Sequence, residues 1–185
     1  MSDTQRQNET IGVILGRRSI RVFEARKVEP EKVETILECA FAAPSAMNAQ
    51  PCHIVAIDDK DLLTKIGAAN ERTRMAGDAP LAFAVCVDVA NYEKVHRLTD
   101  GTWMEDGACV MENILLAARA LGLEGVWLQI ANRKGREEVV TPMLHLPAGV
   151  RILAMALVGY GAESKAPHSG VDTARLHRNI WQPGR

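Results

Sequence analysis

Aromatic side chains are scarce in this sequence: Phe, Trp and Tyr together make up only 4% of its 185 residues. The volume of a hydrophobic core must then come from Ala, Leu, Ile, Val and Met. This composition favours a small, tightly packed α+β domain over a sandwich of aromatic-rich strands. No internal repeat or low-complexity segment interrupts the chain, and its length is typical of one folded unit, so we expect a single domain over residues 1–185.

An excess of one charge is also missing. The sequence carries 22 Lys and Arg against 23 Asp and Glu, a formal net charge of -1. This balance gives no electrostatic reason to expect a nucleic acid or an anionic membrane as partner, so the expected partner is a small molecule. No apolar run reaches the length of a membrane span, and the polar residues 1–10 lack the apolar stretch of a secretion signal. We therefore expect a cytoplasmic protein.

Paired cysteines and several familiar catalytic motifs are absent. The cysteines stand singly, with no C-x-x-C pair and no His at metal-ligand spacing, which predicts reduced thiols and no metal site. The sequence contains no G-x-x-x-x-G-K-[ST], H-E-x-x-H or G-x-S-x-G, and Gly159-Tyr160-Gly161 lacks the third glycine of a dinucleotide fingerprint. These absences argue against a P-loop NTPase, a zinc metalloprotease, an α/β-hydrolase and a Rossmann dehydrogenase. The five histidines are scattered, and we assign none of them a catalytic role.

Hydrophobic periodicity and turn residues predict a series of helices and buried strands. Helices are expected over residues 11–15, from 30 to the stop at Pro44, around 62–66, and over 104–121 and 137–144. Strands are expected over residues 52–57, 81–87, 126–130 and 152–158. Residues 70–78 are charged and irregular in pattern, which indicates a mobile loop.

The predicted helix over residues 104–121 is apolar almost all round, so it has to be covered on most of its sides. One small domain supplies little cover for such a helix, which favours a subunit interface along it. The tail beyond Gly161 is polar, with apolar anchors only at Leu176, Ile180 and Trp181. The Trp near its end favours a tail that wraps around another surface rather than one that frays.

Two polar segments flank the helix that begins at Pro30. Residues 17–21 read Arg-Arg-Ser-Ile-Arg, and residues 44–51 read Pro-Ser-Ala-Met-Asn-Ala-Gln-Pro. Taken separately, the first is typical of a solvated charged face and the second of turn chemistry. Together they supply what flavin mononucleotide (FMN) requires: guanidinium groups and a hydroxyl for its phosphate, and amides for the edge of its ring.

Five segments of the chain, taken in order, match a known family. They are residues 17–21, 43–51, 117–123 with the pattern Ala-Ala-x-x-Leu-Gly-Leu, 125–127 with Gly-Val-Trp, and 158–160 with Val-Gly-Tyr. Through these segments, which extend over nearly the whole chain, the sequence resembles the nitroreductase family of flavoproteins. The resemblance implies an α+β, nitroreductase-like fold with a central, mainly antiparallel sheet flanked by helices. It also implies a homodimer formed through long helices, with two FMN sites built at the interface from both chains.

By the same resemblance, each site residue would contact a particular part of FMN. The phosphate and the ribityl chain would be held by Arg17, Arg18 and Ser19, with Lys165 completing the phosphate site and Arg21 near the ring. The partner subunit would supply Pro44, Ser45, Ala46 and Asn48. The other side of the ring would face the backbone of Val126, Trp127 and Leu128, and its pyrimidine edge would meet Asn70, with Arg72 or Arg74 beside it.

The sequence departs from the family pattern at two positions that bear on the surroundings of the ring. The family usually has an aromatic residue after Gln-Pro, where this chain has Cys52, and commonly has Gly where this chain has Gln129. A single Cys without a resolving partner is more often a small buried hydrophobe than a redox thiol, and we interpret Cys52 in that way.

The function implied by the resemblance is an NAD(P)H-dependent FMN oxidoreductase. The flavin would take hydride from NADH or NADPH and pass it to a small oxidised acceptor such as a nitroaromatic or a quinone, and no protein group is needed as nucleophile or general base. Three alternatives stay open. They are another enzyme on this fold, such as an aromatic dehalogenase or a flavin-destroying enzyme; a non-catalytic flavin-binding redox sensor or FMN carrier; and a generic α+β domain whose arginines are surface charge.

Overall fold

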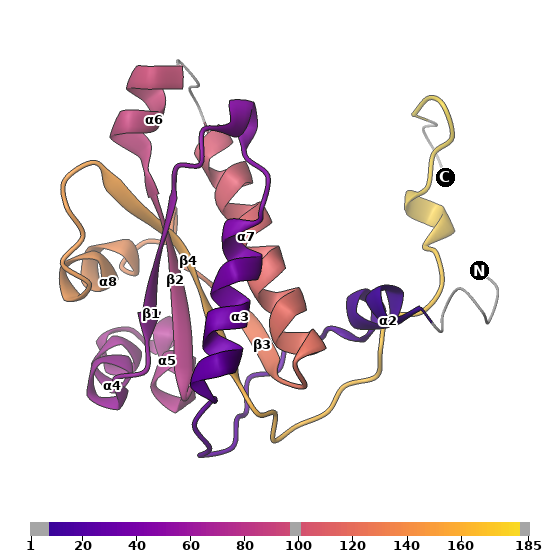
Figure 1. Cartoon of the computed structure of the whole chain (residues 1–185), viewed down its shortest axis with the longest axis horizontal. Coiled ribbons are helices and arrows are strands. Elements are labelled where there is room, and N and C mark those ends of the chain that lie inside the picture. The colour runs from indigo at the N-terminus through magenta and orange to yellow at the C-terminus, as the bar shows by residue number, and fades with distance from the viewer. Residues whose placement is uncertain (1–7, 97–100, 182–185) are drawn as a thin grey trace.

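The computed structural model describes residues 8–96 and 101–181, so residues 1–7 of the polar start lie outside the described residues (Figure 1). Four strands form one sheet in the order β1-β2-β4-β3, and every neighbouring pair is antiparallel. The strands are β1 (Cys52–Ile57), β2 (Leu81–Asp88), β3 (Glu124–Gln129) and β4 (Val150–Gly159). The predicted antiparallel sheet is confirmed, and β1 and β3 are its two edges.

Helices cover both faces of the sheet, α3 and α7 on one face and α4, α5 and α8 on the other (Figure 1). The helices are α2 (Glu9–Gly16), α3 (Pro30–Phe41), α4 (Lys60–Ala69), α5 (Met75–Asp78), α6 (Val89–His96), α7 (Thr102–Ala120) and α8 (Glu137–Met143). The short 3₁₀ turns are η1 (Ala46–Asn48), η2 (Glu71–Thr73) and η3 (Thr173–Arg175). None of the helices in the described ranges is both long and apolar enough to cross a membrane.

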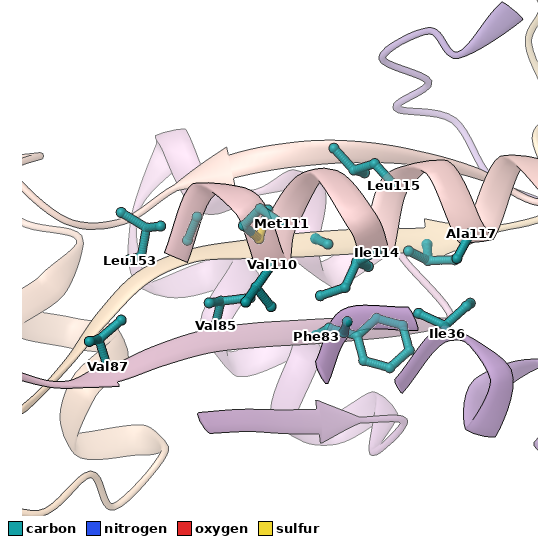
Figure 2. Packing of buried hydrophobic residues seen from close by; sticks show 14 of the residues in the cluster. Ile36, Phe83, Val85, Val87, Val110, Met111, Ile114, Leu115, Ala117 and Leu153 are labelled. Carbon is teal, nitrogen blue, oxygen red and sulfur yellow. The ribbon is translucent and has the colours of Figure 1, made fainter. Parts of the chain in front are cut away.

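The central strand β2 explains why the sheet needs cover on both sides. Its residues alternate in direction, so Phe83 and Val85 point toward α3 and α7, whereas Ala84 points toward the opposite layer. Figure 2 shows the first of these layers, in which Ile36 of α3 and Ile114 of α7 lie against the strand. A strand that is buried on both faces is apolar throughout, which is why its sequence reads as a continuous hydrophobic run.

The long helix α7 lies close against the sheet. An added Cβ at Gly107 would come within 2.6 Å of the Leu153 side chain on β4, so the glycine permits the approach. The helix ends at Ala120, and Gly122 follows two residues later with a φ of +74°, a left-handed conformation that favours glycine. The sequence predicted both the helix and this stop, and the structure confirms them.

The segment over residues 70–78 corrects one prediction. The expectation of an irregular loop was wrong, because η2 and α5 form there and pack on α4. The Thr73 hydroxyl donates to the carbonyl oxygens of Ile66 and Asn70, each at 2.7 Å, and Ala76 is fully buried. Thr73 and Ala76 are three positions apart, as residues on one face of a helix are, and both are buried. Because both are small and stand among charged residues, they give no hydrophobic pattern in the sequence. Helix α6 was also not predicted.

The two ends of the described chain lie side by side, away from the sheet (Figure 1). The backbone N–H of His168 donates to the carbonyl of Leu15 at the end of α2, at 3.0 Å. Farther along the tail, the predicted apolar anchors remain exposed, with Ile180 73% and Trp181 77% accessible. The described chain itself therefore does not cover the tail.

Candidate functional site

The first site segment, residues 17–21, is fixed against the start of β3. Helix α2 ends at Gly16, and Arg17 continues in an extended conformation. Ser19 then forms a parallel bridge with Gly125, and the backbone N–H of Ile20 donates to the Gly125 carbonyl at 3.2 Å. The Ile20 side chain is almost fully buried, so the segment is held both by its backbone hydrogen bond and by this side chain in the core. Arg17 and Arg18 are thus held beside the first residues of this strand.

The tail brings a further cation to the same place. The Lys165 ammonium donates to the carbonyl oxygen of Ser19 at 2.6 Å, although the two residues are 146 positions apart. Glu163 fixes this arrangement, since its carboxylate accepts from the backbone N–H of Arg21 at 2.6 Å and lies 3.2 Å from Lys165. The hydrogen bond from Arg21, together with that from Lys165, lowers the pKa of Glu163. The structure therefore places Lys165 beside the predicted phosphate-binding segment.

Strand β3 offers a backbone edge that the sheet does not use. Its inner edge pairs with β4, whereas at its outer edge the Gly125 carbonyl accepts from Ile20 and the Gln129 carbonyl accepts from Arg136 at 2.5 Å. The twofold alternation of a strand directs the N–H and carbonyl of Trp127 to this outer edge as well. The side chains of the flanking residues, Val126 and Leu128, are buried in the core, and the same alternation turns their backbone groups toward β4. Of the three positions predicted to face the ring, Trp127 is the one that directs its backbone outward.

The second site segment, residues 44–50, is held by a buried carboxylate that the sequence interpretation missed. The Asp106 Oδ1 accepts from the backbone N–H of Ala46 at 2.9 Å, and its Oδ2 accepts from the Tyr92 hydroxyl at 3.0 Å. Asp106 is only 5% exposed, and burial followed by the hydrogen bond to Asp106 raises the pKa of Tyr92 to about 12. The sequence contained one indication of this role, because Asp106 is the single Asp among the apolar residues of the predicted helix over 104–121.

The backbone of this loop is strained at three residues, and such conformations persist only where surrounding contacts hold them. Met47, Asn48 and Gln50 all have left-handed backbones, with φ of +53°, +55° and +48°. The Ser45 hydroxyl accepts from the backbone N–H of Gln50 at 2.9 Å, which closes the loop on itself. The loop therefore has a fixed conformation in which the Met47 side chain is 74% exposed.

Within one chain, the two site segments are held at different positions along α7. The loop over residues 44–50 docks at Asp106, whereas Arg17 lies near Glu112, with Nε 3.7 Å from its carboxylate oxygen. Six residues of helix separate these two anchor points by about 9 Å. The structure brings Arg17–Ser19, Lys165 and β3 together and leaves Pro44, Ser45, Ala46 and Asn48 apart from them.

Asn70 occupies the opposite end of β3, where its amide is already engaged. Its Oδ1 accepts from the backbone N–H of Arg72 at 2.9 Å, and its Nδ2 donates to the Gly135 carbonyl at 3.3 Å. This second bond joins η2 to the loop that contains Arg136. Asn70 is therefore near the outer edge of β3, with both of its amide atoms bound within the chain.

Cys52 lacks the chemistry of a redox thiol. Burial, with a smaller contribution from Asp106, raises the pKa of its thiol to about 12, so it remains protonated at neutral pH. It is partly buried against the core beside α7, in keeping with its interpretation as a small hydrophobe. In residues 8–96 and 101–181, no group of three or more His, Cys, Asp or Glu side chains is placed to hold a metal ion.

The chemistry of these groups fits a flavin mononucleotide. Arg17, Arg18 and Lys165 supply positive charge and the Ser19 hydroxyl supplies a hydrogen-bond donor at one end of β3, as a phosphate requires. The outward backbone groups of Trp127 can donate and accept along the edge of a planar ring. A sequence profile described as the Nitroreductase family matches residues 14–99 and 68–160. The chain belongs to the nitroreductase family.

Individual relatives agree with this assignment. A protein of Archaeoglobus fulgidus, provisionally named NADH dehydrogenase/NAD(P)H nitroreductase, is 34% identical over 94% of this chain and 99% of its own length. The solved structure of an FMN-dependent nitroreductase from Clostridium difficile superimposes with a TM-score of 0.83 at 28% identity, covering 92% of this chain and 99% of that one. A 5,6-dimethylbenzimidazole synthase of Rhodospirillum rubrum is 30% identical over 91% of this chain and 87% of its length. The nitroreductase-like fold is thus confirmed.

Proposed function

We propose that this member of the nitroreductase family is an FMN-dependent oxidoreductase that transfers hydride from NADH or NADPH to a small oxidised acceptor such as a nitroaromatic or a quinone. The observation that carries the proposal is the convergence of Arg17–Ser19, Lys165 and the outer edge of β3. The names of relatives support the cofactors, among them the FMN-dependent nitroreductase of Clostridium difficile and an FMN reductase [NAD(P)H] of Bacillus subtilis. We place this activity in one domain over residues 1–185, in the cytoplasm, where free thiols such as the four cysteines persist.

Each part of the chain has a positioning role in this proposal. FMN, when bound, supplies the hydride-transfer chemistry. The phosphate is held by Arg17, Arg18, Ser19 and Lys165, and the ring is oriented by Arg21, Asn70 and the backbone of Val126, Trp127 and Leu128. The partner subunit contributes the loop with Pro44, Ser45, Ala46 and Asn48. The proposal assigns no residue as general acid, base or nucleophile.

We expect the purified protein to carry FMN without a covalent bond. The phosphate and ring contacts are both represented in the chain, and the proposal needs no further lobe for the adenylate half of FAD. Heat release of the cofactor followed by chromatography identifies it. Recovery of FAD, or a flavin-free protein that does not bind added FMN, would contradict the proposal.

We also expect a homodimer, because the described residues leave several large apolar side chains exposed at the surface. Phe41 at the end of α3 is 58% exposed and Met47 in the site loop 74%, in addition to the uncovered tail with Trp181. Burying such side chains across a twofold axis would also bring the loop over residues 44–50 to the partner's site. Light scattering at micromolar concentration measures the mass. A folded, flavin-bearing monomer would refute this expectation.

A second candidate is a flavin-destroying enzyme on the same fold. The relationship to the 5,6-dimethylbenzimidazole synthase of Rhodospirillum rubrum supports keeping it, because that relative is named for a reaction other than nitro or flavin reduction. The two candidates differ in the fate of the flavin. An oxidoreductase that reduces a quinone regenerates oxidised FMN after each turnover, so the amount of FMN stays constant through repeated cycles. Loss of FMN during turnover would favour the second candidate.

A further inference from the structure

A group of arginines gathers beyond the far end of β3, away from the predicted phosphate site. Arg136 donates from Nη1 to the Gln129 carbonyl, and Arg133 lies one turn earlier, where its carbonyl accepts from the Arg136 backbone N–H at 3.0 Å. Arg72 comes from η2, which the Asn70–Gly135 hydrogen bond joins to this loop. We call Arg72, Arg133 and Arg136 the arginine cluster.

The cluster concentrates like charges, and no ion pair among the described residues offsets them. Burial, followed by the charges of Arg72 and Arg133, lowers the pKa of the Arg136 guanidinium. Among the described residues, none of the ion pairs includes a member of the cluster. The neighbouring Glu137 is already bound by Arg151, whose two guanidinium nitrogens lie 2.9 Å from its oxygens. Repulsion within the cluster is therefore not relieved by the described part of the chain.

One member also has an unused donor. The Nε of Arg136 is buried and has no hydrogen-bond partner among the described residues. A buried guanidinium donor without a partner is costly, and it is satisfied when an acceptor binds. Arg72 and Arg133 are exposed, so their donors are open to a ligand from solvent.

The position of the cluster relates it to the flavin site. Gly125, which binds the Ser19–Ile20 segment, and Gln129, which binds Arg136, lie four residues apart on the same outer edge of β3, a separation of about 13 Å. The cluster is thus at the opposite end of the edge from the residues assigned to the FMN phosphate. In the proposed arrangement of FMN, the cluster would therefore lie toward the ring and away from the phosphate.

We propose that the arginine cluster binds a phosphate group of the nicotinamide dinucleotide that donates the hydride, an inference that rests on the proposed function. A single guanidinium is enough to pair a carboxylate, whereas a phosphate ester carries about two negative charges and several acceptor oxygens. Several guanidinium groups close together can bind the several oxygens of such an anion. Arg binds phosphate in a bidentate geometry that Lys does not reproduce. The phosphate is either the 2′-phosphate of NADPH or the pyrophosphate that NADH and NADPH share.

The test measures binding of NADP⁺ and NAD⁺ to the flavin-loaded protein by calorimetry, with Arg72→Gln and Arg133→Gln as variants. Both side chains are exposed, so the substitutions leave the core intact. Lys65→Gln is the control, because it removes one positive charge from the exposed side of α4, and Lys65 is not among the charges that act on Arg136. We expect each cluster variant to raise the Kd of NADP⁺ about tenfold. The control should stay within about twofold of wild type.

The outcomes distinguish the source of the phosphate. An effect on NADP⁺ alone identifies the 2′-phosphate, and an equal effect on NADP⁺ and NAD⁺ identifies the pyrophosphate; both support the cluster as a site. Unchanged affinity for both dinucleotides in both variants, or a changed flavin potential with unchanged dinucleotide affinity, would overturn it. Flavin content is measured first, so failure of the proposed function is seen separately. In that event, titration with inorganic pyrophosphate still tests the cluster, and equal binding by wild type and both variants would reject it.

Discussion

Replacing Arg17 or Arg18 with Ala is expected to weaken FMN binding by about 1.5–3 kcal/mol, the scale of a hydrogen bond to a charged group. This corresponds to an increase of about tenfold to more than a hundredfold in the dissociation constant. The physical reason is that a bidentate contact between guanidinium and phosphate cannot be made by a short neutral side chain. Titration of the apo-protein with FMN, followed by quenching of flavin fluorescence, measures the change.

Riboflavin is the control for this prediction because it lacks the phosphate. Its affinity should be nearly the same for the wild type and both variants. The stability of the protein should also change little, since the ion pair of Arg17 with the half-exposed Glu112 is long, at 3.7 Å, and exposed pairs contribute little. Equal FMN affinity in the wild type and both variants would remove the phosphate role of these arginines.

Replacing Asp106 with Ala is expected to lower the free energy of unfolding by about 2–4 kcal/mol, because one buried and one partly buried donor lose this acceptor. The backbone N–H of Ala46 and the hydroxyl of Tyr92 both donate to this carboxylate. The loop that Asp106 holds contains three left-handed residues, so it should also relax, and its amides should exchange faster with solvent. Denaturant unfolding and hydrogen exchange measure the two effects.

The neighbouring residue provides a matched control for this variant. Glu105 is also an acid on α7, but it is exposed, so Glu105→Ala should change stability by less than about 0.5 kcal/mol. Tyr92→Phe removes only one of the two bonds to Asp106 and should cost about 1 kcal/mol. If Asp106→Ala were as stable as Glu105→Ala, with unchanged exchange at Ala46, the carboxylate would not be the anchor of the loop.

The regular elements of the fold were predictable because their sequence signals are local. Pro51 and Asp58 bracket the apolar run of β1, and the predicted strand over residues 52–57 coincides with the observed one. Pro30 likewise stands in the first turn of α3, where proline is tolerated. By contrast, η2 and α5 escaped prediction because their inward residues, such as Thr73 and Ala76, are small and lie among charged side chains.

The sequence indicated which segments form the candidate site, but it did not indicate which residues contact one another there. The segments containing Arg17 and Ser45 stood out through their composition, and the resemblance gave them roles. No local pattern indicates that Lys165 reaches Ser19, because that contact depends on the path of the tail. The docking of Ala46 on Asp106 depends in the same way on how α7 lies against the loop. Contacts of high sequence separation follow from the packed fold, and hydrophobic periodicity alone does not encode them.

Anaerobic addition of NADH or NADPH to the purified flavoprotein tests whether the protein takes hydride from a nicotinamide dinucleotide. We expect at least one donor to bleach the absorbance of the oxidised flavin, and a quinone added afterwards to restore it, because the bound flavin would accept hydride from the dinucleotide and pass it to the acceptor. A bound flavin that stays oxidised with both donors would contradict the assignment of this chain as an NAD(P)H-dependent oxidoreductase.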